Sequence, residues 1–265
     1  MQVFTDDGAR IDARVDGSAA SRAVVLIHGF PFARTIWDAQ RDALAGVARV
    51  VALDLRGAGN SSAPDGPYLM ERLAADVATL LDGLGVERAA LIGHSMGGYV
   101  ALAFARMFTE RVSHLALVAS RLAADTPEQA AARHELANRT EQSAAIEPVV
   151  AAYLPRLLSP VTREKRTAIV ENAYAIARKT SPRGAAATLR GMALRAASDD
   201  IAADLDLPVL VIAGQCDETL PIAESRDVAT RFVRGQIVEC SESGHLPMLE
   251  EPERVSAALS GWLTL

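Results

Sequence analysis

The chain has 265 residues, half of them hydrophobic, which is enough to bury a sizeable core within one α/β domain. The formal net charge is −6 and no Lys/Arg block stands out, which argues against a nucleic-acid partner. No apolar run reaches the roughly 18 to 20 residues that cross a bilayer, the polar first residues lack the layout of a secretory signal, and two cysteines make no disulfide framework. We therefore expect a cytoplasmic protein that has no membrane partner and carries two free thiols.

Short apolar runs alternate with amphipathic segments along most of the chain. The first residues predict an antiparallel hairpin, and runs rich in Val, Ile and Leu predict buried strands at 23–28, 50–55, 89–94, 112–120, 208–214 and 235–240. Helical spacing of apolar residues predicts helices at 35–46, 68–85, 97–108 and 252–265. This alternation predicts an α/β fold, in which helices cover both faces of a doubly wound, mostly parallel sheet of about eight strands in three layers.

One long segment, residues 121–204, interrupts the alternation. It contains no convincing strand, and five prolines divide it into short pieces with enough apolar side chains to pack. We expect a helical cap at 121–204, inserted between two parts of one core, 1–120 and 205–265. A disordered insert is the alternative.

The pentapeptide Gly93-His94-Ser95-Met96-Gly97 fits the pattern G-x-S-x-G between a predicted strand and a predicted helix. This context is typical of a nucleophile elbow. Such a sharp turn predicts a positive φ for Ser95, and it requires glycine at 93 and 97 because side chains there would collide with neighbouring chain. We predict Ser95 as a nucleophile; the alternative is a glycine-rich turn that happens to contain a serine.

A serine hydroxyl is a weak nucleophile and needs a base. Among the five histidines, His245 is the favoured base, because it lies in a loop after strand 235–240, where open α/β sheets hold functional residues. His94 should point away from Ser95, His114 should be structural, and His134 should lie on a solvated face.

The base needs an acid to orient it, and an oxyanion needs two N–H donors. Asp217 follows strand 208–213 and is the favoured acid, with Glu218 as the alternative. The order Ser95, Asp217, His245 agrees with the order typical of hydrolases. We predict that the N–H groups of Met96, which follows the nucleophile, and of Phe30, in the loop after strand 23–28, form the oxyanion hole.

Five segments of the chain resemble the α/β-hydrolase-fold serine hydrolases in the same order: HGF (28–30), DLRGAGNS (54–61), GHSMGG (93–98), PVLVIAGQCD (208–217) and GHLPMLEEPERV (244–255). Bacterial carboxylesterases, 3-oxoadipate enol-lactonases and cofactor-free haloperoxidases are most similar in the core. The resemblance implies the same catalytic and oxyanion residues, a variable helical cap, and a structural role for the loop DLRGAGNS, tied down by Asp54 and Arg56. Relatives that displace halide or open epoxides use Asp at the nucleophile position, so Ser95 argues against those reactions.

The expected function is hydrolysis of small carboxylic esters or lactones through an acyl-enzyme, without a cofactor or metal. The same triad could instead serve a perhydrolase or haloperoxidase, a lyase or a carbon–carbon hydrolase; a non-catalytic ligand receptor is a third class. Arg190 and Arg195 could meet a substrate carboxylate, although solvent exposure is the simpler expectation. The residues expected to line an apolar substrate pocket are Phe30, Phe32, Trp37, Met192, Leu220 and Leu246. Trp37 could equally pack its own helix onto the sheet, and a homodimer is left open.

Overall fold

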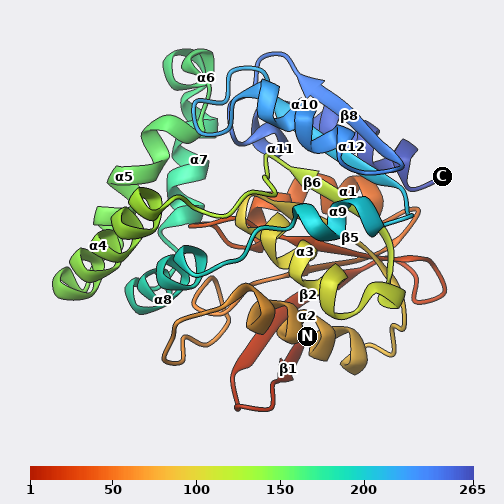
Figure 1. Ribbon diagram of the computed structural model, residues 1–265, viewed down its shortest axis with the longest axis horizontal. Coiled ribbons are helices and arrows are strands. Elements are labelled where there is room, and N and C mark those ends of the chain that lie inside the picture. The colour runs from red at the N-terminus through yellow and green to blue at the C-terminus, as the bar shows by residue number, and fades with distance from the viewer.

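The computed structural model describes residues 1–265 and contains one sheet of eight strands (Figure 1). The strands run in the spatial order β1-β2-β4-β3-β5-β6-β7-β8. Strand β2 is antiparallel to both β1 and β4, whereas all other neighbours are parallel. Their bounds are β1 (Gln2–Phe4), β2 (Arg10–Asp16), β3 (Ala23–Ile27), β4 (Arg49–Leu53), β5 (Ala89–His94), β6 (Val112–Val118), β7 (Val209–Gly214) and β8 (Gly235–Cys240).

Twelve α-helices and two 3-10 turns, Arg34–Trp37 and Thr109–Arg111, complete the chain. None of these helices combines the length and the apolarity that a bilayer crossing needs. The helices are α1 (Asp38–Leu44), α2 (Met70–Gly83), α3 (Met96–Met107), α4 (Pro127–Ser143), α5 (Glu147–Leu157), α6 (Pro160–Lys165), α7 (Thr167–Ala177), α8 (Pro182–Ala193), α9 (Asp199–Asp204), α10 (Ile222–Thr230), α11 (Pro247–Glu250) and α12 (Pro252–Trp262).

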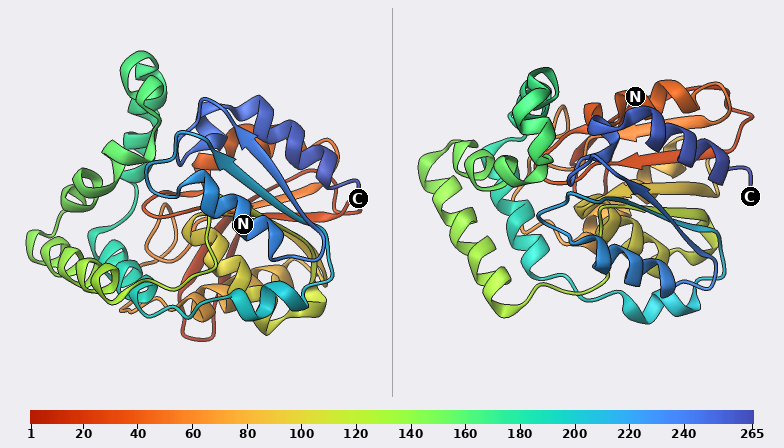
Figure 2. Two further views of the ribbon diagram at one scale, coloured as in Figure 1. Left: turned by 45° about the horizontal axis from the view of Figure 1, so that its top comes forward. Right: turned by 90° about the horizontal axis from the view of Figure 1, so that it is seen from above.

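The predicted fold class, a three-layer α/β sheet, is confirmed. Every residue of β3, β5 and β7 is buried, so these strands are apolar throughout rather than alternating. Helices α1 and α12 lie on one face of the sheet, and α2 and α3 lie on the other (Figure 2, right). The sequence analysis missed α10, whose buried side is confined to Ser225, Val228 and Ala229 and therefore leaves a weak helical signal.

Helices α4–α8, called the cap helices below, gather to one side of the sheet (Figures 1 and 2). Helix α9 follows them in the chain but lies beside α3, where Arg106 donates to the Ala197 carbonyl at 3.0 Å and pairs with Asp200. Residues 121–204 thus contain helices and loops but no strand, as expected. Their treatment as a separate cap domain, apart from a core of 1–120 and 205–265, remains a prediction.

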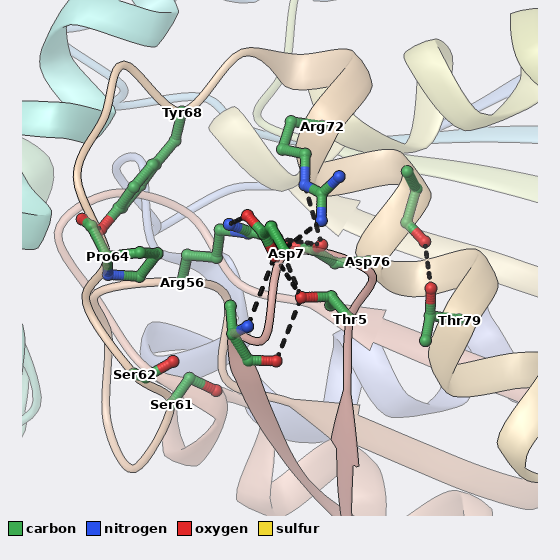
Figure 3. Close-up of polar contacts among 12 residues, drawn as sticks. Thr5, Asp7, Arg56, Ser61, Ser62, Pro64, Tyr68, Arg72, Asp76 and Thr79 are labelled. Atoms are coloured by element: carbon green, nitrogen blue, oxygen red, sulfur yellow. Dashed lines mark hydrogen bonds and ion pairs between the residues drawn. The ribbon is translucent and has the colours of Figure 1, made fainter.

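The loop after β4 is held by ion pairs, as expected for Asp54 and Arg56. The carboxylate of Asp54 accepts the Arg34 N–H at 2.8 Å and the Asn60 N–H at 2.9 Å. The Arg56 side chain is 2% exposed and joins Asp76 of α2 to Asp7 of the β1–β2 hairpin (Figure 3). Because an unpaired buried guanidinium is costly, these carboxylates hold the loop against the sheet.

Helix α8 docks on this same loop through backbone contacts. A Cβ added to Gly184 would lie 2.3 Å from the Gly57 Cα, and one added to Gly191 would lie 1.7 Å from the Tyr68 carbonyl oxygen. The Ser181 N–H also donates to the Gly57 carbonyl at 2.9 Å. Only glycine permits such an approach, so one end of the cap is closely seated on the core.

Candidate active site

Ser95 lies on the sharp turn between β5 and α3, with φ of 50° and ψ of −115°. A Cβ at Gly93 would lie 2.3 Å from the Gly97 carbonyl oxygen, and a Cβ at Gly97 would lie 2.3 Å from the Ile27 carbonyl oxygen. The predicted positive φ and the need for both glycines are confirmed. The backbone at Gly93 and at Gly97 lies so close to neighbouring carbonyl groups that no side chain fits at either position.

A positive φ at a residue other than glycine costs on the order of 1–3 kcal/mol and persists only where neighbours enforce it. Here the Ser95 N–H donates to the Val118 carbonyl at 2.8 Å, and the Ser120 hydroxyl donates to the Ser95 carbonyl at 2.9 Å. The end of β6 therefore holds the strained residue from both sides. Ser120 was not singled out from the sequence, where it is only the residue after an apolar run.

Three side chains distant in sequence form one hydrogen-bonded chain. The Nε2 of His245 lies 2.9 Å from the Ser95 hydroxyl oxygen, and its Nδ1 lies 2.6 Å from Asp217 Oδ2. Because a carboxylate only accepts, Nδ1 carries the proton, and Nε2 of the neutral ring is free to accept from the hydroxyl. Asp217 Oδ1 accepts the N–H groups of Thr219 at 2.7 Å and Leu220 at 2.9 Å. The ring is thereby placed as a base toward Ser95.

Glu218, the alternative acid, points to a different partner. It pairs with Arg163 of α6 at 2.6 Å, while Asp217 bonds to the His245 imidazole.

Cys216, next to Asp217, is partly exposed, and its Sγ lies 3.7 Å from the Ser241 carbonyl. Cys240 is buried, which raises the pKa of its thiol to about 12. Both thiols are free, as expected.

His94, directly before Ser95, points away from it as predicted and supports His245 instead. Its Nε2 donates to the His245 carbonyl at 2.9 Å, and the two rings lie 5.3 Å apart between centroids. Burial holds the pKa of His94 well below its usual value, so the ring is neutral. His28 is also buried and neutral, and its Nε2 accepts the Leu55 N–H at 2.9 Å. Each of these two neutral rings therefore holds a backbone group of a neighbouring loop in place.

The loop that carries His245 is held by a buried carboxylate that the sequence analysis missed. Glu250 Oε1 accepts the Gly244 N–H at 2.9 Å, and its Oε2 accepts the Ser159 N–H at 2.9 Å. The His245 N–H donates to the Leu157 carbonyl at 2.8 Å. In the run LEEPERV two adjacent glutamates look alike, and only the tertiary contacts decide which one is buried.

A cavity of about 60 Å³ opens above Ser95 and His245. Three predicted apolar residues line it, namely Phe30, Met192 and Leu220. The three other predicted pocket residues lie elsewhere: Phe32, Trp37 and Leu246 are fully buried outside the cavity. Phe32 and Trp37 pack against the His94 ring, which agrees with the alternative that Trp37 is a packing residue.

Several polar cavity residues were missed, since nothing local in the sequence sets them apart. The polar ones are Tyr99, Arg121, Arg133, Tyr153 and Thr219, and the apolar Ala119 and Leu157 complete the lining. The expected exposure of Arg195 is wrong, because the side chain is buried with its guanidinium 3.8 Å from the centre of the Tyr99 ring. Arg190 does not reach the cavity and pairs with Glu141 within the cap.

Backbone donors are available beside Ser95. Met96 is the first residue of α3, so its N–H has no partner four residues earlier in the helix, and the positive end of the helix dipole lies there. Phe30 lines the cavity, and its ring packs edge-on against Tyr153 of the cap at 5.3 Å between centroids. Nowhere in the chain do three or more His, Cys, Asp or Glu side chains form a group that could hold a metal ion.

Comparisons with known proteins give one consistent family. A sequence profile described as alpha/beta hydrolase fold matches residues 22–252. A malate-bound thermophilic esterase from Thermogutta terrifontis is 35% identical with a TM-score of 0.94, covering 100% of this chain and 98% of that one. The enol-lactonase from Burkholderia xenovorans LB400 is 27% identical with a TM-score of 0.91, covering 100% of both chains. A 112-residue segment is 39% identical to epoxide hydrolase 3 of Xenopus tropicalis but covers only 42% of this chain and 30% of that protein.

Proposed function

Because the chain belongs to the alpha/beta hydrolase fold family, we propose that it is a serine hydrolase that cleaves small carboxylic esters or lactones. The observation that carries this proposal is the hydrogen-bonded chain from the Ser95 hydroxyl through His245 to Asp217, with distances of 2.9 and 2.6 Å. The similarity to an esterase and to an enol-lactonase over the full chain supports the same substrate class.

The proposed reaction has two steps and begins at Ser95. Nε2 of His245 accepts the hydroxyl proton while the oxygen attacks the ester carbonyl carbon. His245 then gives that proton to the leaving alcohol, and the acyl group remains on Ser95. In the second step His245 takes a proton from water, which attacks the acyl-enzyme. His245 then returns that proton to the Ser95 oxygen as the acid is released, so both groups regain their starting states. In a lactone the alcohol and the acid stay in one product.

Two further groups stabilise the charges that develop. Asp217 keeps the proton of His245 on Nδ1 and stabilises the imidazolium cation. The N–H groups of Phe30 and Met96 donate to the oxyanion, and removal of one such donor typically costs about 3 kcal/mol of transition-state stabilisation. The fixed positive end of α3 favours the same negative charge.

The runner-up function uses the same residues for perhydrolase, haloperoxidase, lyase or carbon–carbon hydrolase chemistry. Epoxide opening is disfavoured despite the partial similarity to an epoxide hydrolase, because such relatives use Asp where this chain has Ser95. The proposal therefore predicts measurable turnover of simple esters, and a peracid assay in acetate and peroxide separates it from a perhydrolase.

The test is the variant Ser95→Ala, assayed with 4-nitrophenyl acetate. We expect kcat to fall by about 10⁴- to 10⁶-fold, because the nucleophile is lost while the binding groups stay. Labelling by a fluorophosphonate should likewise disappear. Ser18→Ala, at an exposed turn, is the matched control and should keep both activity and labelling. Full esterase activity in a folded Ser95→Ala protein, checked by thermal unfolding, would refute the proposal.

A further inference from the structure

Two arginines beside the cavity, Arg195 buried and Arg133 mostly buried, share a single carboxylate. Arg133 of α4 and Arg195, after α8, both pair with Asp125. Their side chains are 18% and 3% exposed, and that of Asp125 is 2% exposed. Two cations and one anion leave one positive charge in surplus. A buried surplus charge is unfavourable unless a further anion or polar groups compensate it.

No other carboxylate at the cavity forms an ion pair with either arginine. Glu224 pairs with Arg121 at 3.1 Å, and Asp217 bonds to His245 at 2.6 Å. Although burial alone would lower it, the pKa of Arg133 lies above its ordinary value because the Asp125 carboxylate favours the cation. Arg133 therefore keeps its positive charge at the cavity wall.

Hydrogen-bond donors at this wall also outnumber their acceptors. Arg133 has five N–H groups, and they make four contacts: two with Asp125, one with the Tyr153 oxygen at 2.8 Å and a weak one with the Met192 sulfur at 3.6 Å. Tyr153 accepts from Arg133, but its own O–H has no acceptor. Burial raises the pKa of Tyr153, so this hydroxyl keeps its proton. The buried Thr219 hydroxyl also has no partner.

We propose that the substrate ester carries a second, ionised carboxylate, which Arg133 and Tyr153 bind. This inference rests on the proposed hydrolysis at Ser95 and names the substrate class of that same site. A carboxylate accepts several donors at once, and it pairs with a planar guanidinium through short charge-assisted hydrogen bonds. The substrate carboxylate would neutralise the surplus charge and accept hydrogen bonds from the donors that have no partner.

The size and the remaining lining of the cavity limit the rest of the substrate. A volume of about 60 Å³ has room for roughly four to six water-sized groups. Phe30, Leu157 and Met192 supply an apolar lining for methylene groups between the ester and the carboxylate. The part of the substrate beyond the ester carbonyl must therefore be short, as in a monoester of succinic acid.

A purely structural explanation makes a different prediction. Arg133 and Tyr153 both belong to cap helices, so their contact could serve only to join α4 to α5. Loss of such a contact would reduce the hydrolysis of neutral and anionic esters to the same degree. If the two residues bind a carboxylate, their loss should instead lower the ratio of kcat/KM between an anionic ester and a neutral one.

The experiment compares monomethyl succinate with methyl 4-oxopentanoate, a neutral ester of nearly the same shape. Turnover is followed by proton release in a pH-stat. We expect kcat/KM to be about 10- to 100-fold higher for the anionic ester, as charge-assisted hydrogen bonds allow. Free succinate should also inhibit hydrolysis of 4-nitrophenyl acetate competitively.

The variants are Arg133→Met, which leaves Arg195 to pair with Asp125, and Tyr153→Phe, which removes one oxygen and keeps the ring. Each should lower the ratio of kcat/KM between the two esters, Arg133→Met to near unity, and should weaken inhibition by succinate. Arg190→Met, at a cap arginine outside the cavity, is the matched control and should keep both the ratio and the inhibition.

Two results would overturn the inference: a wild-type ratio at or below unity, or a ratio that stays unchanged in folded Arg133→Met and Tyr153→Phe proteins. Failure of the proposed function is recognised separately, because hydrolysis of 4-nitrophenyl acetate would then survive Ser95→Ala. Serine-dependent hydrolysis of that neutral ester without any preference for the anionic one would reject the carboxylate site alone.

Discussion

At the scale of single residues, the histidines show that chemical role follows from neighbours rather than from residue type. His245 has a carboxylate on one nitrogen and a hydroxyl on the other. His94 and His28 are buried below the site and held neutral, and each bonds to backbone. His114 lies far from the cavity, edge-on to Trp262 with ring centroids 5.2 Å apart.

The stability of the protein should depend on pH through His114. Burial, and then the charge of Arg22, lower the pKa of His114 from 6.5 to about 4. The unfolded chain therefore binds more protons than the folded protein between these values, so the stabilising contribution of neutral His114 is present above pH 6.5 and is lost as the pH falls toward 4. The free energy of unfolding in urea should decrease over this window, and less steeply in His114→Gln. Equal slopes in the two proteins would contradict the expectation.

At the scale of secondary-structure elements, the position of a helix can depend on a residue with poor helix propensity. Gly191 lies within α8 and Gly261 within α12. A Cβ at Gly191 would meet the Tyr68 carbonyl oxygen at 1.7 Å, whereas a Cβ at Gly261 would meet nothing within 4 Å. Glycine therefore permits a close backbone contact in α8, whereas in α12 no contact requires it.

Alanine at these two positions should change stability in opposite directions. Gly261→Ala should raise the free energy of unfolding by up to about 1 kcal/mol, because alanine is the better helix former. Gly191→Ala should lower it by about 1–3 kcal/mol, because α8 must move off the loop at Tyr68. Chemical denaturation measures both values. A gain in both variants would mean that propensity outweighs the backbone contact.

At the scale of the whole molecule, the cap helices and the sheet form the cavity together. Tyr153, Leu157 and Met192 come from the cap, whereas Ser95 and His245 come from loops of the sheet. The backbone bond from the His245 N–H to the Leu157 carbonyl, 2.8 Å long, joins the two parts directly at the site. The size of the cavity is therefore set at this junction.

The small cavity predicts a preference for short acyl chains among neutral esters. 4-Nitrophenyl acetate or propionate should be hydrolysed with higher kcat/KM than the octanoate, because the cavity of about 60 Å³ ends at the cap. Leu157→Ala, which removes a lining side chain but keeps the backbone bond, should move the optimum by about two carbons. Leu158→Ala, a buried neighbour that does not line the cavity, is the control for lost packing and should keep the wild-type profile. An unchanged profile in Leu157→Ala would show that another residue sets the limit.

The amino-acid sequence by itself determined the fold and the elbow at Ser95. Buried parallel strands read as apolar runs, and a turn that needs glycine on both sides of a serine is a local constraint, so short windows of sequence hold both signals. The residues brought together at the elbow, Ser95, Asp217 and His245, could also be proposed from sequence, because each follows a strand and the carboxyl ends of parallel strands meet at one edge.

Only the tertiary structure decided which side chains form the cavity and where its charge lies. Phe32 and Trp37 look like pocket residues in sequence yet pack under His94, while Arg133 and Tyr153 line the cavity although their helices carry no distinguishing pattern. The physical reason is that burial and pairing of a side chain depend on contacts between elements far apart in the chain. Whether an arginine faces water, an aspartate or a substrate is settled by those contacts and not by its local sequence.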